Sequence, residues 1–379
     1  MKIDHIVWGT FDTGKPRVRM LVEALYEIDQ HMPVYHRSPW VGIEDKTQVK
    51  GVKAKLQILA RWVLAYPWLI MAYLRAPAHD TVIVPYPGNL DVLVLWPFAK
   101  LRGARICWDM FISLYDTAVI DREILARTGV LARLLYAFEW LSTRAASFIL
   151  MDTQEHARYI AKLYGLANER VRSVWVGVED RIFARAPAPP PSLVTDVLFY
   201  GQFIPLHGVD TIIDAIGMIE NQPGAPAMRF VIVGSGQEAS RIDQCIVNRR
   251  LKSIERIKWV DYADLPALIA RSAICLGVFA EEGKAARVIP NKVFQILSVG
   301  RPLVTMDSPA IREIVAPGKA VRLVTAGSAV SLADMLVQLA RELQSNTTAD
   351  AIFAALESEM PVAGHTVVRK QLTRALEIE

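Results

Sequence analysis

Short apolar runs alternate with helix-like stretches along the first half of the chain. Each run is bounded by glycine, proline or polar turns, and together they predict strands at residues 5–9, 81–85, 105–110 and 147–151. Apolar positions recur with helical spacing from about residue 17 to residue 28. Strands that alternate with helices indicate a mainly parallel sheet covered on both faces. We therefore predict an α/β fold.

A proline-rich segment, residues 186–191, interrupts this pattern. Its prolines cannot continue a helix or join the interior of a sheet, so the segment favours extended geometry. Because 379 residues suit two hydrophobic cores, we predict one domain over residues 1–188 and another from residue 189 onward. The pattern restarts in the second half with strands at 196–200, 229–233, 257–260, 274–278 and 302–306, and with helices at 209–219 and 291–299.

Composition narrows the class of protein. Apolar residues make up 52% of the chain and charged residues 22%, so we expect it to fold throughout. The net charge is only +4, and no basic run is interleaved with stacking aromatics, so nucleic acid is not an expected partner. Three dispersed cysteines suggest neither disulfides nor a zinc site. The N-terminus lacks the apolar run of a signal peptide, so we expect a cytoplasmic protein.

The longest apolar segment covers residues 56–74. Gln57, Arg61 and Pro67 interrupt it, and a central arginine is costly in a bilayer, so a membrane-spanning helix is disfavoured. We expect a core helix. The alternative is a helix that lies on a membrane interface, because the segment combines Arg61 with Trp62, Tyr66, Trp68 and Tyr73.

The first loop with binding chemistry spans residues 9–19. Loops after the strands of an open α/β sheet are where ligands bind. Gly14 permits a close backbone approach, and Lys15, Arg17 and Arg19 bring positive charge to the start of a helix. This combination favours an anionic ligand. The alternative is a plain turn with exposed bases.

A second loop carries a glycine pattern. Residues 231–239 fit G-x-G-x-x-A between a strand and a helix, and Asp261 follows the next strand. Alone, this pattern would suggest an NAD-dependent oxidoreductase. However, the strand is the second of its domain rather than the first, and short glycine patterns often occur without a cofactor.

The third loop, within residues 279–302, is charged and follows a predicted strand. Pro290 is suited to open the helix that follows, so Asn291, Lys292 and Gln295 fall on its first two turns. Three bases gather near this helix start, which suits a diphosphate: Lys284, Arg287 and Lys292. The alternative is a solvated charged loop.

Four sequence pieces occur in an order that is typical of one family. They are Phe-Tyr-Gly-Gln at 199–202, His-Gly-Val-Asp at 207–210, Val-Gly-Ser-Gly-Gln-Glu at 233–238, and Pro-Asn-Lys-Val-Phe-Gln at 290–295 with Gly-Arg-Pro at 300–302. This succession resembles the carboxyl-terminal domain of glycosyltransferase family 4. The first half resembles the family more weakly, at residues 152–154 and 174–179.

The resemblance implies a GT-B architecture, in which two Rossmann-like doubly wound domains face an interdomain cleft. The second domain, residues 189–364, would hold the nucleotide sugar, and residues 365–379 would form a helix that crosses back to the acceptor-side domain. The implied reaction moves a sugar from a UDP- or GDP-sugar to an acceptor hydroxyl with retention of configuration. The family generally works without a catalytic metal, so no cofactor is expected.

Site residues follow from the same resemblance. Gln202 stands where the family has arginine, His207 stands where it has lysine, and its paired glutamates fall on Arg287 and Gln295. We therefore expect Glu281 or Glu282 to take over the glutamate role, and Asp109 to lie near the donor sugar and the acceptor. The alternative for Asp109 is a buried structural aspartate that caps the next turn. The predicted catalytic residues are Asp109, Glu281 and Arg287, and the predicted donor-binding residues are Gly14, Gly201, Gln202, His207, Gly234, Val260, Lys284, Pro290, Asn291, Lys292 and Gln295.

The acceptor is the least constrained part of the prediction. Apolar stretches at residues 56–73 and 90–98 suggest a lipid-linked acceptor reached by peripheral contact with the inner membrane face, in polysaccharide or glycolipid assembly. A saccharide acceptor is the other possibility. Two alternatives of the same fold stay open: a nucleotide-sugar epimerase, and a non-catalytic sugar-nucleotide binding protein in which the departures from the family pattern reflect lost activity.

Overall fold

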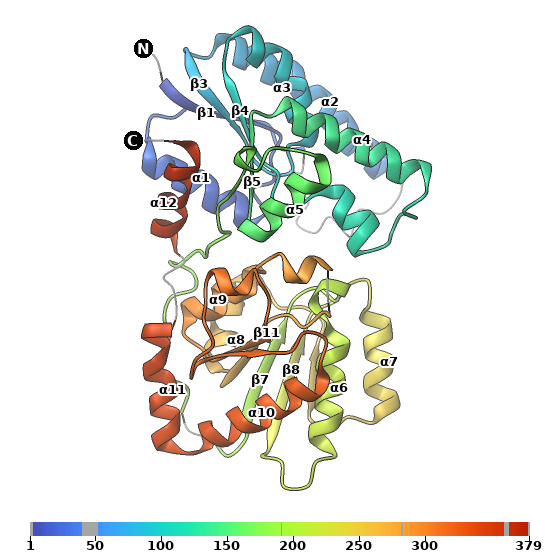
Figure 1. Ribbon diagram of the computed structural model, residues 1–379, viewed down its shortest axis with the longest axis vertical. Coiled ribbons are helices and arrows are strands. Elements are labelled where there is room, and N and C mark those ends of the chain that lie inside the picture. The colour runs from blue at the N-terminus through green and yellow to red at the C-terminus, as the bar shows by residue number, and fades with distance from the viewer. Residues whose placement is uncertain (1–2, 40–51, 191, 282, 360–363, 378–379) are drawn as a thin grey trace. The chain divides into compact units, whose positions relative to one another are not determined.

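The computed structural model describes residues 3–39, 52–190, 192–281, 283–359 and 364–377. Glu282, one of the residues considered for the glutamate role, lies outside the described residues. The chain divides into two compact units (Figure 1). Unit 1 comprises Met1–Val176 together with His365–Glu379, and unit 2 comprises Gly177–Gly364.

Unit 1 is built on a six-stranded sheet in which every pairing is parallel. Its strand order is β2-β1-β3-β4-β5-β6. The strands are β1 (Ile3–Gly9), β2 (Val34–His36), β3 (His79–Val84), β4 (Arg105–Asp109), β5 (Phe148–Met151) and β6 (Val171–Ser173).

Helices cover both faces of this sheet, because successive strand residues point to opposite sides. Trp8 and Val82 pack under one group of helices, whereas Val7 and Ile83 pack under the other. The first face carries α2 (Val52–Arg75), α3 (Asn89–Leu101), α4 (Val130–Ala145) and α5 (Gln154–Tyr164), and the second carries α1 (Pro16–Ile28) and α12 (His365–Leu376).

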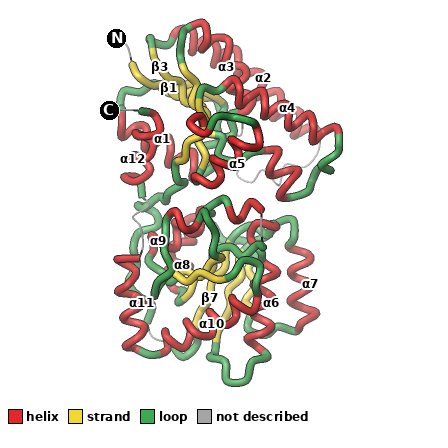
Figure 2. The backbone as a smooth tube through the Cα atoms, in the orientation of Figure 1, coloured by secondary structure: helices red, strands yellow, loops and turns green. Residues whose placement is uncertain are grey.

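Unit 2 repeats the design with another six-stranded parallel sheet, in the order β12-β11-β10-β7-β8-β9 (Figure 2). Its strands are β7 (Thr195–Tyr200), β8 (Met228–Val233), β9 (Ile254–Ile257), β10 (Ile274–Leu276), β11 (Leu303–Met306) and β12 (Val321–Val324). Its helices are α6 (Val209–Glu220), α7 (Ala239–Arg249), α8 (Leu265–Arg271), α9 (Asn291–Val299), α10 (Ala329–Gln344) and α11 (Asn346–Glu359).

The boundary between the units lies at Val176, not at residue 188 as the proline-rich segment suggested. Residues after Val176 already bond to unit 2: the Ser298 hydroxyl donates to the Phe183 carbonyl at 2.6 Å, and the Ala186 amide donates to the Val299 carbonyl at 3.0 Å. The Arg301 guanidinium also donates to the Pro187 carbonyl at 2.6 Å. The proline-rich segment is therefore part of the surface of unit 2.

Two other expectations need correction. The predicted strand at 257–260 is β9, Ile254–Ile257, so Val260 lies in the loop that follows the strand. The helix expected at 56–74 exists, as α2, but it is not a core helix: among the described residues it is the one helix long and apolar enough to span a membrane, and only 18% of that window, within Leu56–Arg75, is buried.

The C-terminal helix α12 belongs to unit 1, where it packs against α1. Val368 and Leu372 are buried in the same cluster as Leu21 of α1. The Gln371 side-chain oxygen accepts a 2.8 Å hydrogen bond from the Trp175 amide, which ties the helix to the last residues of the unit. Unit 1 is thus completed by the end of the chain.

If α12 completes the core of unit 1, Leu372→Ala should lower the stability of that unit by about 2–5 kcal/mol, because Leu372 is fully buried. Urea unfolding followed by tryptophan fluorescence reports mainly on unit 1, since every tryptophan except Trp259 lies there. Lys370→Ala on the exposed side of the same helix is the control and should change stability by less than about 0.5 kcal/mol. Equal effects of the two substitutions would contradict the assignment.

Candidate functional site

The order of the strands in unit 2 marks one place where a ligand can enter. From β7 the chain proceeds to β8 and β9 on one side, and then returns to β10 on the other side of β7. In open parallel sheets the loops on either side of such a reversal diverge and leave a crevice at the carboxyl ends of the strands. In unit 2 this point lies between the residues that follow Tyr200 and those that follow Leu276.

Three of the predicted donor-binding residues converge there. Gly201 directly follows β7 with a φ of +146°, and a Cβ atom at this position would lie 2.9 Å from both the His207 ring and the Lys292 Nζ. Both side chains are almost completely buried. His207 is held by a contact between its Nδ1 and the Gln202 carbonyl oxygen. The loop after β7 and the first turn of α9 therefore place the His207 imidazole and the Lys292 amine next to the backbone of Gly201, which has no side chain.

The Lys292 amine lies in an unusual place for a charge. Its Nζ lies 3.9 Å from the centroid of the Phe199 ring and donates a long hydrogen bond, 3.5 Å, to the Gly277 carbonyl. Burial lowers the pKa of Lys292 well below its usual range. An anionic group placed beside Gly201 would favour the charged amine again, so this site is suited to a phosphate.

The glycine pattern at 234–239 has a packing role. Gly234 has a φ of +143°, and a Cβ atom there would lie 1.8 Å from the Gly201 carbonyl oxygen, so only glycine fits. From the same loop, the Glu238 amide donates a 3.0 Å hydrogen bond to the Phe203 carbonyl. Asp261 is exposed, and its carboxylate accepts a hydrogen bond from the Trp259 indole. These contacts explain the pattern without a dinucleotide.

The remaining predicted residues of unit 2 surround this centre less closely. Lys284 is buried in the short turn Gly283–Ala286, which packs against the turn Pro205–His207. The Arg287 amide donates to the Lys284 carbonyl at 3.0 Å. Pro290 caps α9, and Asn291 is its first residue. Glu281 is exposed and lies against Gly327.

Two predicted donor contacts are not supported by their positions. Gln295 is buried, and its side-chain oxygen accepts a 2.9 Å hydrogen bond from the Tyr200 hydroxyl, so that oxygen is already engaged within the unit. Val260 follows β9, the edge strand, which is separated from β7 by β8. At about 4.8 Å between neighbouring strands, that places β9 roughly 10 Å from the switch point.

Unit 1 has its own reversal, between β1 and β3, and a cavity of about 420 Å³ lies there. The strand order again predicts the place, because the loops after these strands diverge. The wall includes Thr10 after β1 and the segment from Tyr86 to Asp91 after β3. It is completed by Lys15, Trp62, Tyr66, Leu114 and Phe138.

A buried carboxylate organises this cavity. Asp91 accepts hydrogen bonds from the Thr10 amide at 2.8 Å, the Thr10 hydroxyl at 2.9 Å and the Tyr66 hydroxyl at 2.8 Å. Burial nevertheless raises the pKa of Asp91. Next to it, the buried Asn89 Oδ1 has no hydrogen-bond partner among the described residues. Asn89 and Asp91 were not predicted as site residues, although Gly88 lies in the loop after a strand, as Gly14 does.

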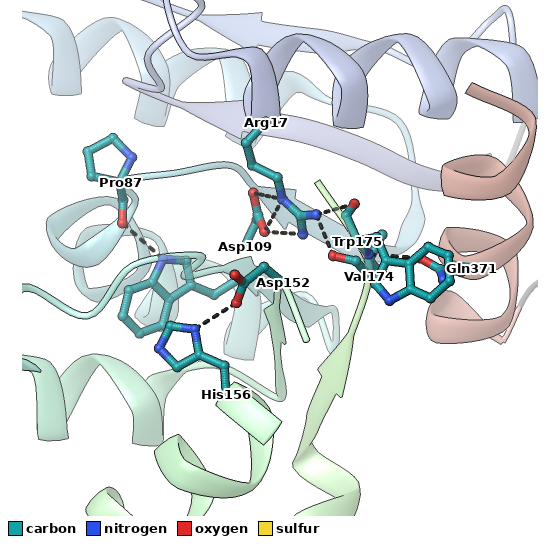
Figure 3. Close-up of polar contacts among 9 residues, drawn as sticks. Arg17, Pro87, Asp109, Asp152, His156, Val174, Trp175 and Gln371 are labelled. Carbon is teal, nitrogen blue, oxygen red and sulfur yellow. Dashed lines mark hydrogen bonds and ion pairs between the residues drawn. The ribbon is translucent and has the colours of Figure 1, made fainter. Parts of the chain in front are cut away.

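Asp109 forms a buried ion pair with Arg17 (Figure 3). The Arg17 Nη2 donates to Asp109 Oδ1 at 2.7 Å, and Arg17 Nη1 donates to the carbonyls of Val174 and Trp175 at 2.5 and 2.8 Å. Neither side chain is exposed. Asp109 therefore supports the fold rather than presenting an oxygen to substrate, and Arg17 is not an anion ligand as the loop at 9–19 suggested. Gly14 is exposed in that loop, where its amide donates to Asp12.

A second buried pair lies beside the first. The Asp152 carboxylate and the His156 Nδ1 are 2.6 Å apart at the start of α5 (Figure 3). His156 is fully buried. Within the part of the chain that the structure describes, no group of three or more His, Cys, Asp or Glu residues is placed to hold a metal ion.

Comparison with known proteins identifies relatives of this architecture. Residues 194–342 match the family model described as Glycosyl transferases group 1. The chain is 24% identical over 295 residues to the chitobiosyldiphosphodolichol beta-mannosyltransferase of Candida albicans, covering 73% of this chain and 63% of that protein. It is 27% identical over 115 residues to the protein of the same name from Yarrowia lipolytica, covering 30% of this chain and 24% of that one. The chain thus spans less than two thirds of the length of either relative.

Solved structures share the fold. HepE of Anabaena in complex with UDP superposes with a TM-score of 0.64 at 15% identity over all of both chains. The sucrose-phosphate synthase of Thermosynechococcus elongatus gives a TM-score of 0.68 at 14% identity, over 99% of this chain and 98% of that one. The prediction of an α/β fold with two Rossmann-like domains is confirmed, and so is the predicted resemblance to this transferase family.

The depressed pKa of Lys292 predicts how stability changes with pH. Between the folded-state pKa and the usual value of 10.5, the unfolded chain binds more protons at this residue than the folded chain does, so the free energy of unfolding should rise as pH is raised. Lys292→Met should be more stable than the wild type near pH 7, and this advantage should shrink toward pH 10 or so. Urea unfolding across that range measures it. Lys319→Met, which changes an exposed lysine before β12, is the control, and a difference between Lys292→Met and wild type that does not vary with pH would contradict the assignment.

The buried ion pair makes a different prediction. Asp109→Leu leaves the Arg17 charge buried without its partner, so it should destabilise unit 1 by about 3–5 kcal/mol. The double variant Arg17→Met, Asp109→Leu should recover part of that loss, because it removes both charges. Glu123→Gln, in the exposed pair with Arg127, should cost less than about 1 kcal/mol. A double variant that is less stable than Asp109→Leu alone would contradict the structural role.

Proposed function

Because residues 194–342 match the family model described as Glycosyl transferases group 1, we propose that the chain transfers a sugar from a nucleotide-diphosphate sugar to an acceptor hydroxyl. The observation that carries this proposal is the convergence of His207 and the buried Lys292 amine on Gly201, at the switch point of unit 2. The amine of Lys292 and the N-terminus of α9, next to the backbone of Gly201, are suited to bind a diphosphate. The UDP complex of the similar HepE structure supports a donor of this class.

The chemical task of these groups is electrostatic. As the bond from the anomeric carbon to the diphosphate breaks, negative charge grows on the leaving group. The acceptor hydroxyl oxygen bonds to the same carbon, and its proton passes to the departing diphosphate. Lys292 and the first amides of α9 are fixed before the reaction starts, so they stabilise that charge without rearranging. We propose retention of configuration and no resident cofactor, as the family resemblance implies.

The cavity of unit 1 is the proposed acceptor site. Its wall combines an apolar part, from Trp62, Leu90 and Phe138, with the polar groups of Asp91 and Asn89. Such a wall suits an acceptor with hydroxyls and an apolar portion. The names of the two curated relatives specify a dolichol-linked acceptor, which supports a lipid-linked acceptor here over a free saccharide. We accordingly propose a cytoplasmic enzyme, peripheral on the membrane, in glycolipid or polysaccharide assembly.

A second function is favoured by one observation. Arg287 and Gln295 stand where the family resemblance expects glutamates, and Gln295 is engaged by Tyr200. A protein that binds a nucleotide sugar without transferring it would tolerate both changes. Binding without turnover, over a broad range of acceptors, would favour this second function.

The proposal is tested by screening nucleotide sugars for thermal stabilisation of the full chain, followed by product analysis with lipid-linked and free saccharide acceptors. Stabilisation by one UDP- or GDP-sugar and transfer to an acceptor are the expected results. A converted sugar nucleotide that appears without any acceptor would indicate an epimerase. If no nucleotide sugar stabilises the protein, the proposal is wrong.

Within this test, Lys292→Gln should weaken binding of the stabilising donor by about 10- to 100-fold, as expected for loss of a charge-assisted hydrogen bond of about 1.5–3 kcal/mol. Titration calorimetry measures the affinity. In the wild type, donor binding should also take up protons, which calorimetry detects as a dependence of the heat on the buffer, and Lys292→Gln should lose part of that uptake. Lys319→Gln is the matched control and should bind the donor normally. An unchanged affinity in Lys292→Gln would remove Lys292 from the donor site.

A further inference from the structure

Three neighbouring helices of unit 1 expose an apolar surface. The inner sides of α2, α3 and α4 pack into the core of unit 1, and α3 contacts both of the others. Figure 1 shows them together on one side of the sheet. Their outer sides carry large apolar residues that are exposed among the described residues. We call these the outer surface, and its members are Leu56, Val63, Leu64, Trp68, Met71, Leu74, Leu90, Trp96, Val130, Leu131, Leu134, Trp140 and Leu141.

Each of the three helices contributes one exposed tryptophan that carries a cation on its ring. Arg37 lies 4.3 Å from the ring centroid of Trp68 on α2, and Lys100 lies 5.2 Å from that of Trp96 on α3. On α4, Arg144 lies 4.0 Å from the ring centroid of Trp140. Tryptophan paired with a cation is the combination that favours the headgroup level of a membrane, where an indole and a phosphate are both within reach.

The charges on the outer surface have one sign. Among the described side chains of α2, α3 and α4, the acids are Asp91 and Glu139, and both are buried. Glu139 accepts hydrogen bonds from the Leu114 and Tyr115 amides inside unit 1, so its carboxylate adds no charge to the outer surface. The exposed charges on these helices are therefore basic: Arg61, Arg75, Lys100 and Arg133. An apolar surface with basic residues complements an anionic bilayer.

We infer that the outer surface docks onto a membrane whose headgroups include anionic phospholipids. The tryptophans would sit at the headgroup level with Leu64, Met71 and Leu134 among the first carbons of the acyl chains, and the basic side chains would contact phosphates. Soluble monomers rarely expose contiguous apolar patches larger than a few hundred Å², so an extended surface of this kind needs a partner.

Docking on the interface fits α2 better than spanning does. Leu69 and Tyr73 are buried in the core of unit 1, and the Trp8 indole donates a 2.9 Å hydrogen bond to the Leu69 carbonyl. A spanning α2 would have to withdraw these residues from the core. A helix that keeps its inner side on the sheet and places its outer side in the headgroup region leaves those contacts intact.

The same surface reaches the proposed acceptor cavity. Leu90 is exposed and also lines the cavity, and Trp62 and Phe138 bring α2 and α4 into the same wall. Resting on the proposed function, this arrangement would let a lipid-linked acceptor enter the cavity from the bilayer that the protein occupies. The docking itself requires no turnover, so it can be tested separately.

The test is flotation of the purified full chain with vesicles of phosphatidylcholine alone or with about one third phosphatidylglycerol. The wild type should float with the anionic vesicles, bind phosphatidylcholine at least about tenfold more weakly, and lose most binding in about 0.5 M salt. Lys100→Glu with Arg133→Glu should lose the preference for anionic lipid. Trp96→Ser with Trp140→Ser should weaken binding to both kinds of vesicle.

The matched controls make the same types of substitution, Lys→Glu and Trp→Ser, at exposed residues outside the outer surface. Lys370→Glu changes an exposed lysine on α12, which covers the opposite face of the sheet, and Trp259→Ser changes an exposed tryptophan of unit 2. Both should float like the wild type. Equal loss in the controls and in the outer-surface variants would overturn the inference.

Further outcomes separate this inference from the proposed function. Stabilisation by a nucleotide sugar together with failure to bind either vesicle would overturn the docking and leave the transferase proposal standing. Vesicle binding without any nucleotide-sugar stabilisation would support the docking and count against the transferase. If the protein resists alkaline carbonate extraction from membranes, α2 spans the bilayer. If it forms a concentration-dependent dimer and binds no vesicles, a second copy covers the outer surface. Either result overturns the inference.

Discussion

The order of the parallel strands constrains where each unit can bind a ligand. In unit 2 the chain leaves β7 toward β8 and later returns to β10 on the other side, so the carboxyl ends of β7 and β10 lie next to each other at this reversal. Gly201 and Phe279 lie in the loops after these strands, and α9 directs its first turn into the space between them. The same reversal between β1 and β3 produces the cavity of unit 1, with Thr10 on one side and Asn89 on the other. Both candidate sites follow from one topological rule.

Two buried charged groups show how structural and functional sites differ. Arg17 is surrounded by acceptors, since Asp109 and two carbonyl oxygens take up its donors, so its charge is compensated within the fold. The Lys292 amine lies over the Phe199 ring and 3.5 Å from the Gly277 carbonyl. Its pKa falls because, among the described residues, no acid beside it offsets the effect of burial. A compensated charge contributes to stability and specificity of packing, whereas an uncompensated one lowers stability unless a ligand completes it. This contrast, more than exposure, separates Asp109 from Lys292.

The sequence predicted the periodic elements and the loops that matter, but not which side chains would meet. Helix α9 begins and ends where the pattern of apolar positions placed it, and Gly201, His207 and Lys292 converge although Lys292 is far from the other two in sequence. Short strands such as β2 and β6 were missed, because three residues carry too little periodicity. The sequence left a structural and a functional Asp109 open, because a sequence shows residue types without showing that Arg17 is the distant partner of this carboxylate.

Helix α2 illustrates a limit of hydrophobicity as evidence. A core helix, a spanning helix and an interfacial helix can share one composition, and only the side covered by the sheet tells them apart. Leu69 and Tyr73 face the core, whereas Leu64 is 74% exposed. The stability of the fold depends on the inner residues and is indifferent to whether the outer ones are apolar. Folding alone therefore does not explain an apolar outer side, and the reason for it must lie in what the helix contacts outside the unit.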